Sequence, residues 1–323
     1  MTRVLVSDPI ADKGIEILEN AGFEVIYNPN PSNDELQSYS RDISAWIVRS
    51  GTKILAEYLK DARNLQIIGR AGVGVDNIDI NEATNQGIIV MNMPDGNTIS
   101  AAEHTIAMMM TLSRNIQLGH VGILAGEWNR SSLIGSELQG KVLGVVGLGR
   151  IGTAVAMRAK AFGMKVVFYD PYISNGIEKS LNIGRVHHLT DLLVESDIVT
   201  IHTPITDDTK GMVNAEFFNK MKNESSLYNT ARGEIIVMDD LYHALKKRKI
   251  KWAGLDVLET EPIDYDHPLI RAWCEDEKWI SGRLVITPHT AFYNKQSYEE
   301  MRKKAAEELK RIIEGNKPLN RVN

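Results

Sequence analysis

Short apolar runs alternate with amphipathic stretches along the first 98 residues of the chain. The apolar runs, which are typical of buried strands, lie at 3–6, 23–27, 45–48 and 65–68. The stretches with helical periodicity lie between them, at 13–20, 34–39 and 54–60. This alternation predicts a parallel sheet flanked by helices.

The same alternation continues after a boundary at 96–99, a long apolar helix that begins near Ser100, and a connecting arm at 119–141. Further strands are predicted at 142–146, 166–169, 198–201, 226–230, 251–257 and 284–287. Further helices are predicted at 154–161, 189–195, 214–221, 239–246 and 298–313. The last helix is expected to fold back onto the first domain. The fold class is therefore α/β, with two domains that are each a doubly wound parallel sheet.

A glycine-rich turn, Gly147-Leu148-Gly149-Arg150-Ile151-Gly152, joins the strand at 142–146 to the helix that follows. The first glycine makes the tight turn, the second lets the backbone approach a pyrophosphate, and the third lets the helix pack on the strand. The free N–H groups that open the helix, at Arg150 and Ile151, face the phosphates. A strand, this turn and a helix together predict a Rossmann dinucleotide-binding domain.

Asp170 ends the next predicted strand, eighteen residues after Gly152 (170 − 152). A carboxylate at this spacing accepts hydrogen bonds from the adenosine ribose hydroxyls. It also repels a 2′-phosphate, and no arginine stands immediately beside it to receive one. The cofactor is therefore predicted to be NAD. A tight turn without a ligand is the alternative, and the flanking strands and the terminal acid argue against it.

A second glycine-rich loop, at 69–79, follows the strand at 65–68. Ligands of open α/β sheets bind at the carboxyl ends of parallel strands, and glycines there leave backbone N–H groups free to hold an anion. A plain glycine-rich turn explains this stretch equally well.

Composition and charge exclude several other classes of protein. Hydrophobic residues make up 43% of the 323 positions and charged residues 24%, as in globular proteins with room for two domains. The net charge of −5 provides no basic field for nucleic acid. The single cysteine, Cys274, excludes an internal disulfide and is expected to be a packing residue. The first residues contain no apolar segment that predicts a signal or a membrane span, so a cytoplasmic protein is expected.

Two features that resemble other kinds of site have local explanations. The basic run at 246–249 lies at the C-terminus of a predicted helix, where the helix dipole favours cations. This position explains the run without a role in binding nucleic acid. The adjacent His187 and His188 lack the neighbouring cysteines or carboxylates that a metal site needs. We therefore expect no metal.

Chemically capable side chains, Arg232, Glu261 and His289, follow the ends of three predicted strands of the dinucleotide-binding unit. His289 is suited to exchange a proton, because imidazole titrates near neutral pH. Glu261 would orient the ring and stabilise its protonated form, and Arg232 would bind a carboxylate or polarise a keto oxygen. Each residue alone has a structural explanation, as an ion pair, a loop charge or a core histidine. Their shared position at one sheet edge favours catalysis.

Three motifs resemble signatures of the D-isomer-specific 2-hydroxyacid dehydrogenase family. They are Asn229-Thr230-Ala231-Arg232-Gly233, Asp256-Val257 through Glu261-Pro262, and Thr287-Pro288-His289. The resemblance implies a flavodoxin-like substrate-binding domain at 1–98 and 292–323, and an NAD-binding Rossmann domain at 99–291. It also implies a homodimer built through the cofactor domains, and it makes Arg232, Glu261 and His289 catalytic.

The same resemblance assigns further site residues. Backbone groups of Val73 and Gly74 would bind the substrate carboxylate, and Asp256 would meet the nicotinamide amide. The residues that would line the cofactor are Thr203, Pro204, Thr230 and Ala231.

The substrate signals within the family point in two directions. The stretches at 49–52, 69–79, 94–105 and 128–130 look like 3-phosphoglycerate dehydrogenase. Arg49 and Arg130 are the candidates to bind a phosphate, and Ser50 is expected to bind the substrate. By contrast, Ala291-Phe292-Tyr293 and the final segment at 299–323 resemble D-lactate dehydrogenases and C-terminal-binding proteins.

Phe292 follows His289 by three positions and is expected to stand near the third carbon of the substrate. An aromatic ring there disfavours a hydrated phosphate. The preferred prediction is therefore an enzyme that interconverts a 2-oxo acid and a D-2-hydroxy acid. The alternatives are a 3-phosphoglycerate dehydrogenase of serine biosynthesis and, from another class, an NADH-sensing corepressor-like binding protein.

Overall fold

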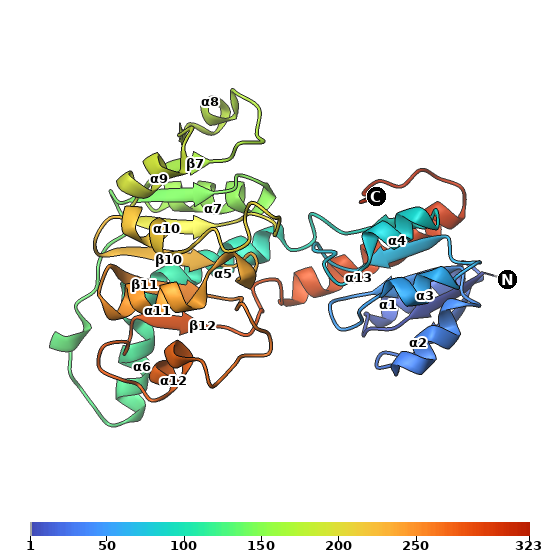
Figure 1. Ribbon diagram of the computed structural model, residues 1–323, viewed down its shortest axis with the longest axis horizontal. Coiled ribbons are helices and arrows are strands. Elements are labelled where there is room, and N and C mark those ends of the chain that lie inside the picture. Colours follow the sequence, from blue (N-terminus) through green and yellow to red (C-terminus); the bar gives the residue numbers. More distant parts are fainter. Residues whose placement is uncertain (1) are drawn as a thin grey trace. The chain divides into compact units, whose positions relative to one another are not determined.

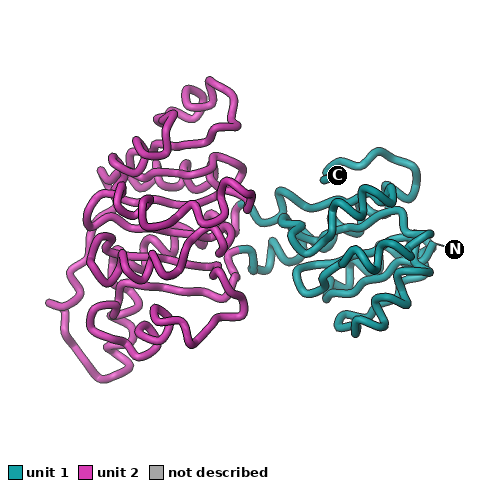
Figure 2. Tube along the Cα trace, in the orientation of Figure 1, with its two compact units in different colours: residues 1–98, 292–323 teal, residues 99–291 magenta. Residues whose placement is uncertain are grey.

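The computed structural model describes residues 2–323, and the chain divides into two compact units (Figures 1 and 2). Unit 1 contains residues 1–98 and 292–323, and unit 2 contains residues 99–291. Unit 2 is therefore a continuous segment inserted into unit 1. The assignment of substrate binding to the first unit stays a prediction.

The sheet of unit 1 has five parallel strands in the order β2-β1-β3-β4-β5. Its strands are β1 (Arg3–Val6), β2 (Glu24–Tyr27), β3 (Ala45–Val48), β4 (Ile67–Arg70) and β5 (Ile89–Met91). Its helices are α1 (Asp12–Asn20), α2 (Asn33–Ser40), α3 (Ala56–Lys60), α4 (Ile80–Asn85) and α13 (Lys295–Ile313). The strand order reverses beside β1, which makes the sheet doubly wound, as predicted.

Alternate residues of the unit 1 strands face two separate apolar cores. Leu5 and Trp46 belong to the core beneath α2, α3 and α4, whereas Val4 and Ile47 belong to the core on the other face. The last helix, α13, packs against α1, β3 and β4 and buries Met301 and other apolar residues in that second core. The expected return of this helix to the first domain is thus observed.

The sheet of unit 2 has seven parallel strands in the order β12-β11-β10-β9-β6-β7-β8. The strands are β6 (Val142–Val146), β7 (Lys165–Tyr169), β8 (Gly184–Arg185), β9 (Ile198–Ile201), β10 (Ser225–Asn229), β11 (Ile250–Leu255) and β12 (Leu284–Ile286). The order reverses between β6 and β9, and a dinucleotide binds at such a switch point in open α/β sheets. The predicted α/β fold with two parallel sheets is confirmed.

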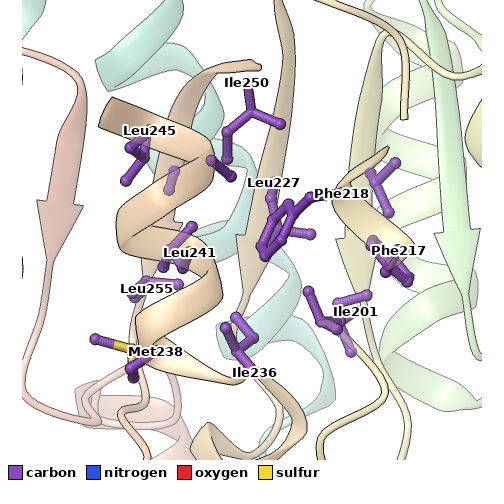
Figure 3. Close-up of a cluster of buried hydrophobic side chains, with 14 of the residues drawn as sticks. Ile201, Phe217, Phe218, Leu227, Ile236, Met238, Leu241, Leu245, Ile250 and Leu255 are labelled. Carbon is purple, nitrogen blue, oxygen red and sulfur yellow. The ribbon is translucent and has the colours of Figure 1, made fainter. Parts of the chain in front are cut away.

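Helices cover both faces of the unit 2 sheet (Figure 1). The helices of unit 2 are α5 (Thr98–Ser113), α6 (Ile116–Leu124), α7 (Arg150–Ala161), α8 (Ile177–Leu181), α9 (Leu189–Glu195), α10 (Ala215–Lys220), α11 (Met238–Lys246) and α12 (Pro268–Cys274). Figure 3 shows one core, in which Leu227 and Leu255 of the sheet meet Phe218 of α10 and Leu241 of α11. On the other face, Met109 of α5 and Val155 of α7 pack against strand residues.

Several short elements differ from the sequence-based expectations. The stretch at 119–141, taken as a connecting arm, begins inside α6, which continues to Leu124. The elements α4, β5, α8, β8 and α12, of two to seven residues, were not predicted. Elements this short show little periodicity, and those that were predicted, such as α3 and β12, were recognised from the alternation of the surrounding segments. The expectation that Cys274 packs in the interior is wrong, because this residue is exposed at the end of α12.

Among residues 2–323, none of the helices combines the length and the apolar character that crossing a lipid bilayer requires.

Arg283, which precedes β12, ties the ends of several elements together. Its guanidinium donates to the carbonyl oxygens of Leu245, Ile250, Lys251 and Trp279 over 2.6–3.0 Å. These carbonyls lie at the end of α11, at the start of β11 and in the loop after α12. One planar group thus satisfies acceptors that the secondary structure leaves open.

We expect Arg283→Lys to lower the free energy of unfolding by about 1–3 kcal/mol, because an ammonium cannot reach all of these carbonyls in one plane. Urea denaturation followed by circular dichroism measures the change. The control is Arg271→Lys, whose side chain is 59% exposed beside Asp266. Equal losses in the two variants would contradict the role of Arg283.

Candidate functional site

The turn between β6 and α7 brings backbone atoms into direct contact. Gly147 has a left-handed φ of +89°, and a Cβ added there would lie 2.8 Å from the carbonyl oxygen of His202. A Cβ on Gly152 would lie 2.1 Å from the carbonyl oxygen of Gly147, so only glycine lets α7 begin this close to the turn. A Cβ on Gly149 would meet nothing within 4 Å, which leaves the backbone accessible where a pyrophosphate is expected.

The first turn of α7 is suited to an anion. Gly149 is its N-cap and provides no side-chain acceptor for the N–H groups that open the helix. Arg150 and Ile151 are the first residues of the helix, and their N–H groups lie at the positive end of the helix dipole. Unsatisfied N–H groups at the start of a 12-residue helix match the requirement of a diphosphate.

Asp170 lies directly after β7 and is fixed beside this turn. Its Oδ2 accepts a hydrogen bond from the N–H of Leu148 at 2.9 Å, and its Oδ1 accepts one from the N–H of Tyr172 at 2.9 Å. Each oxygen retains a lone pair, so the carboxylate can also accept from hydroxyl groups. The bond to Leu148 connects the predicted ribose-binding acid to the predicted phosphate-binding turn.

Thr203 and Pro204 follow β9, on the other side of the same turn. The methyl carbon of Thr203 lies 2.9 Å from the Cβ that Gly147 lacks. Its Oγ1 is buried and has no hydrogen-bond partner within residues 2–323. Because buried hydroxyl groups are normally hydrogen-bonded, this hydroxyl is suited to bind a ligand. Burial lowers the pKa of His202 to about 3, so this histidine remains neutral beside the phosphate-binding turn. These residues fit a dinucleotide.

The loop after β10 presents Arg232 through a shaped turn. The buried side chain of Asn229 accepts from the N–H of Ala231 at 2.9 Å and donates to the carbonyl of Arg232 at 2.7 Å. Gly233 then packs so closely that a Cβ would lie 1.9 Å from the carbonyl oxygen of Leu258. The loop that carries Arg232 therefore lies directly against the loop that carries Glu261.

Glu261 and His289 form an ion pair in which Oε2 and Nδ1 are 2.8 Å apart. The other carboxylate oxygen accepts from the N–H of Leu258 at 3.0 Å. Burial alone would raise the pKa of Glu261, but the bonds from His289 and Leu258 and the charge of Arg232 keep it below its usual value. The structure thus brings Arg232, Glu261 and His289 together, and Glu261 is a carboxylate at neutral pH.

His289 belongs to a turn that Asp256 organises. The N–H of His289 donates to the carbonyl oxygen of Asp256 at 2.7 Å, and His289 adopts a left-handed φ of 52°. The carboxylate of Asp256 accepts from the N–H groups of Thr290 and Ala291, both at 2.8 Å. The side chain of Asp256 is fully buried within the unit. The expected contact of Asp256 with the nicotinamide amide stays a prediction.

In unit 1, the loop after β4 carries two N–H groups that are suited to an anion. The N–H groups of Val73 and Gly74 have no acceptor within the part of the chain that the structure describes. The carbonyl of Val73 is held by the side chain of Asn92 at 2.6 Å, which fixes the orientation of the peptide. Their predicted role in binding a carboxylate is compatible with this geometry.

Arg49 follows β3, and its N–H is fixed by the carboxylate of Asp8 at 2.7 Å. Its guanidinium lies 5.9 Å from the centre of the Tyr298 ring and has no carboxylate partner among residues 2–323. Ser50, the next residue, is exposed. Phe292 is half-buried against the core of unit 1 and packs edge-on to Tyr293, so it has a structural role besides the predicted one.

Within residues 2–323, no group of three histidine, cysteine or acidic side chains is arranged to hold a metal ion. The exposed Arg130 precedes a short 3₁₀ helix, Ser131–Leu133, in the arm after α6.

Two residues at the edge that carries the candidate catalytic group were given no role in the sequence analysis. Thr287 donates its hydroxyl to Asp256 at 2.5 Å, and His104 of α5 lies 3.0 Å from the same hydroxyl. The only signal in the sequence is a histidine in a helix with many apolar, buried residues. That signal says nothing about which distant loop the histidine contacts.

A family model described as D-isomer specific 2-hydroxyacid dehydrogenase, NAD binding domain, matches residues 106–291. This range contains the glycine turn, Asp170 and the Arg232–Glu261–His289 group. It identifies the cofactor of unit 2 as a nicotinamide dinucleotide.

Among curated proteins, the D-3-phosphoglycerate dehydrogenase of Methanocaldococcus jannaschii is 40% identical over 323 residues. The alignment covers 100% of this chain and 60% of that enzyme. The chain spans about three fifths of the length of the curated relatives it matches.

Among solved structures, the TT0316 protein from Thermus thermophilus is 34% identical, with a TM-score of 0.89 and 100% of both chains covered. A glyoxylate reductase from Paecilomyes thermophila has a TM-score of 0.89 at 26% identity, covering 99% of this chain and 98% of its own. The similarity to these structures extends over both units.

Proposed function

The chain belongs to the D-isomer-specific 2-hydroxyacid dehydrogenase family, and on that premise we propose that it interconverts a 2-oxo acid and a D-2-hydroxy acid with NAD as its cofactor. The observation that carries the proposal is the 2.8 Å Glu261–His289 pair beside Arg232. This group lies at the same sheet edge as the glycine turn and Asp170. An acid–base pair, a fixed cation and a dinucleotide site are the components that this reaction needs.

When bound, the nicotinamide supplies or accepts the hydride. Arg232 binds the substrate carboxylate or polarises the keto oxygen, and it remains charged throughout. The Nδ1 of His289 is held by Glu261, so its Nε2 exchanges the proton with the substrate oxygen. In reduction, Nε2 donates the proton to the developing alkoxide, and in oxidation it removes the proton from the hydroxyl. The carboxylate of Glu261 keeps the ring oriented and stabilises the imidazolium.

The preference for NAD over NADP follows from Asp170. We expect kcat/KM with NADH to exceed that with NADPH by roughly 10- to 100-fold, because the carboxylate repels a 2′-phosphate. Asp170→Ala should narrow this ratio, whereas Asp191→Ala, at an exposed acid of α9, should leave it unchanged. Steady-state kinetics with both cofactors measure the ratio, and equal use of the two by the wild type would refute the assignment.

The pH dependence of reduction follows from the charge of Glu261. Reduction needs a protonated His289. The lowered pKa of Glu261 means that this carboxylate is charged, and its negative charge stabilises the protonated ring of His289 as the pH rises. In Glu261→Gln, the high-pH fall of kcat/KM should therefore move down by about one pH unit. The matched control is Glu259→Gln, an exposed carboxylate in the same loop. An unchanged profile in Glu261→Gln would remove Glu261 from this role.

For the substrate, we propose an unphosphorylated 2-oxo acid, since the aromatic Phe292 and Tyr293 lie directly after the turn of His289 and disfavour a dianion. The second candidate is 3-phosphoglycerate. It is favoured by the 40% identity to enzymes named for that substrate and by the guanidinium of Arg49, which has no carboxylate partner among residues 2–323.

Steady-state kinetics decide between these candidates. We expect a higher kcat/KM for one of pyruvate, glyoxylate, hydroxypyruvate and 2-oxoisocaproate with NADH than for 3-phosphoglycerate with NAD. The reverse order, with phosphoglycerate turnover lost in Arg49→Ala and kept in the exposed control Arg41→Ala, would establish the second candidate. Absence of turnover with every acid, together with tight NADH binding, would favour a cofactor-sensing binding protein instead.

We also propose a homodimer that is formed through unit 2. Large apolar side chains of α6 and the following arm are 54–82% exposed, which is unusual for a free surface. They are Ile116, Val121, Ile123, Leu124, Trp128 and Ile134. Burying this patch between two copies of the chain would remove apolar surface from water, which favours association.

A charge placed in this patch should weaken the dimer. Light scattering after size exclusion should give twice the mass of the chain for the wild type and a shift towards monomer for Leu124→Glu. The control is Val194→Glu, at an exposed apolar residue of α9 outside the patch. A monomeric wild type would contradict the proposal.

A further inference from the structure

Asp256 carries a buried negative charge whose partners come from the turn that holds His289. Its Oδ1 accepts from the hydroxyl of Thr287 at 2.5 Å and from the N–H of Thr290 at 2.8 Å, and its Oδ2 accepts from the N–H of Ala291 at 2.8 Å. The side chain has no exposed surface. A carboxylate in this position is stable only while these donors face it, so the charge and the turn hold each other in place.

His104 reaches the same carboxylate through Thr287. Its Nε2 lies 3.0 Å from the hydroxyl oxygen of Thr287 and 3.5 Å from Oδ1 of Asp256. A carboxylate can only accept, so the single hydroxyl proton of Thr287 belongs to its 2.5 Å bond with Asp256. The hydroxyl oxygen must then accept from His104, whose proton is therefore on Nε2. His104 thus donates to Thr287, and Thr287 donates to the buried carboxylate of Asp256.

Helix α5 gives His104 a rigid base. Its residues Ala102 and Met109 are fully buried in the core of unit 2, on either side of His104 along the helix. The next residue, Thr105, lies with its hydroxyl 2.9 Å from that of Thr230, in the loop that leads to Arg232. Consecutive residues of one buried helix thus contact the loop of His289 and the loop of Arg232.

We propose that His104 is a positioning residue that fixes the turn at 287–291 and thereby directs His289 towards Glu261. The turn needs such support, because His289 adopts a left-handed φ of 52°, a conformation that is unfavourable for residues other than glycine. His104 contributes one more donor to the group that surrounds Asp256, and it acts through Thr287 without touching the substrate. The inference rests on the proposed function only where activity is the readout.

The first test uses protein without cofactor. Hydrogen exchange by NMR measures the protection of the N–H groups of Thr290 and Ala291, which donate to the Asp256 carboxylate. His104→Leu removes the donor and should speed their exchange by about tenfold, the effect of one hydrogen bond of ~1.4 kcal/mol. His104→Gln retains a side-chain N–H donor and should restore most of the protection. The control, His188→Leu, changes an exposed histidine before α9 and should have no effect.

The second test uses the acid that the wild type turns over best. His104→Leu should lower kcat by about tenfold and leave KM and the Kd of NADH within about twofold, because only the proton-exchanging ring is displaced. His104→Gln should recover kcat. Thr287→Val should lower kcat at least as much as His104→Leu, because it also removes a donor to Asp256, and the double variant should be no worse than Thr287→Val, since His104 acts only through Thr287.

These measurements separate the two proposals. Unchanged exchange at Thr290 and Ala291 in His104→Leu overturns the positioning role, and so does a His104→Gln variant no better than His104→Leu. A larger effect on the Kd of NADH than on kcat also overturns it, because His104 would then act on the cofactor. A wild type without turnover refutes the proposed function, while the exchange rates still decide the role of His104.

Discussion

The carboxyl edge of the unit 2 sheet depends on close contact between the backbones of neighbouring loops. Gly147 lies against the carbonyl of His202, and Gly233 lies against the carbonyl of Leu258, at separations that no side chain permits. These contacts bring the ends of β6, β9, β10 and β11 to one place, which is where the predicted ligand groups are found. Any residue larger than glycine would separate the dinucleotide turn from its neighbour, or Arg232 from Glu261.

The carboxylates at this edge have different environments and different uses. Asp256 is fully buried, and the donors around it make it a fixed part of the framework. Glu261 has a side chain that is 40% exposed, and it pairs with a His289 ring that is 42% exposed. A buried carboxylate whose oxygens all accept hydrogen bonds organises a loop. A partly solvated carboxylate can stabilise the protonated form of a neighbouring group that exchanges its proton. Two carboxylates of one loop, after β11, thus differ: Asp256 supplies rigidity, and Glu261 is the one suited to the proposed acid–base role.

The sequence predicts the strands, the glycine turn and the meeting of Glu261 with His289, because all of these depend on local patterns and on the parallel order of strands. It does not predict the contact of His104 with Thr287, which joins residues 183 positions apart. No periodicity encodes such a pairing, since it depends on how α5 is placed on the sheet. The ring of Phe292 shows a related limit. Its spacing from His289 is visible in the sequence, but its packing against the core of unit 1 is not.

The insertion of unit 2 into unit 1 sets the order in which the protein can be completed on the ribosome. Unit 2 is continuous, so all of its strands have been synthesised before α13. One apolar face of the unit 1 sheet, which includes Val4 and Ile47, receives Met301 and Leu309 only from that last helix. The nascent chain therefore carries a sheet face that α1 alone covers in part through the synthesis of the whole of unit 2, residues 99–291. An apolar sheet face that waits this long for its covering helix is the kind of surface that chaperones protect during synthesis.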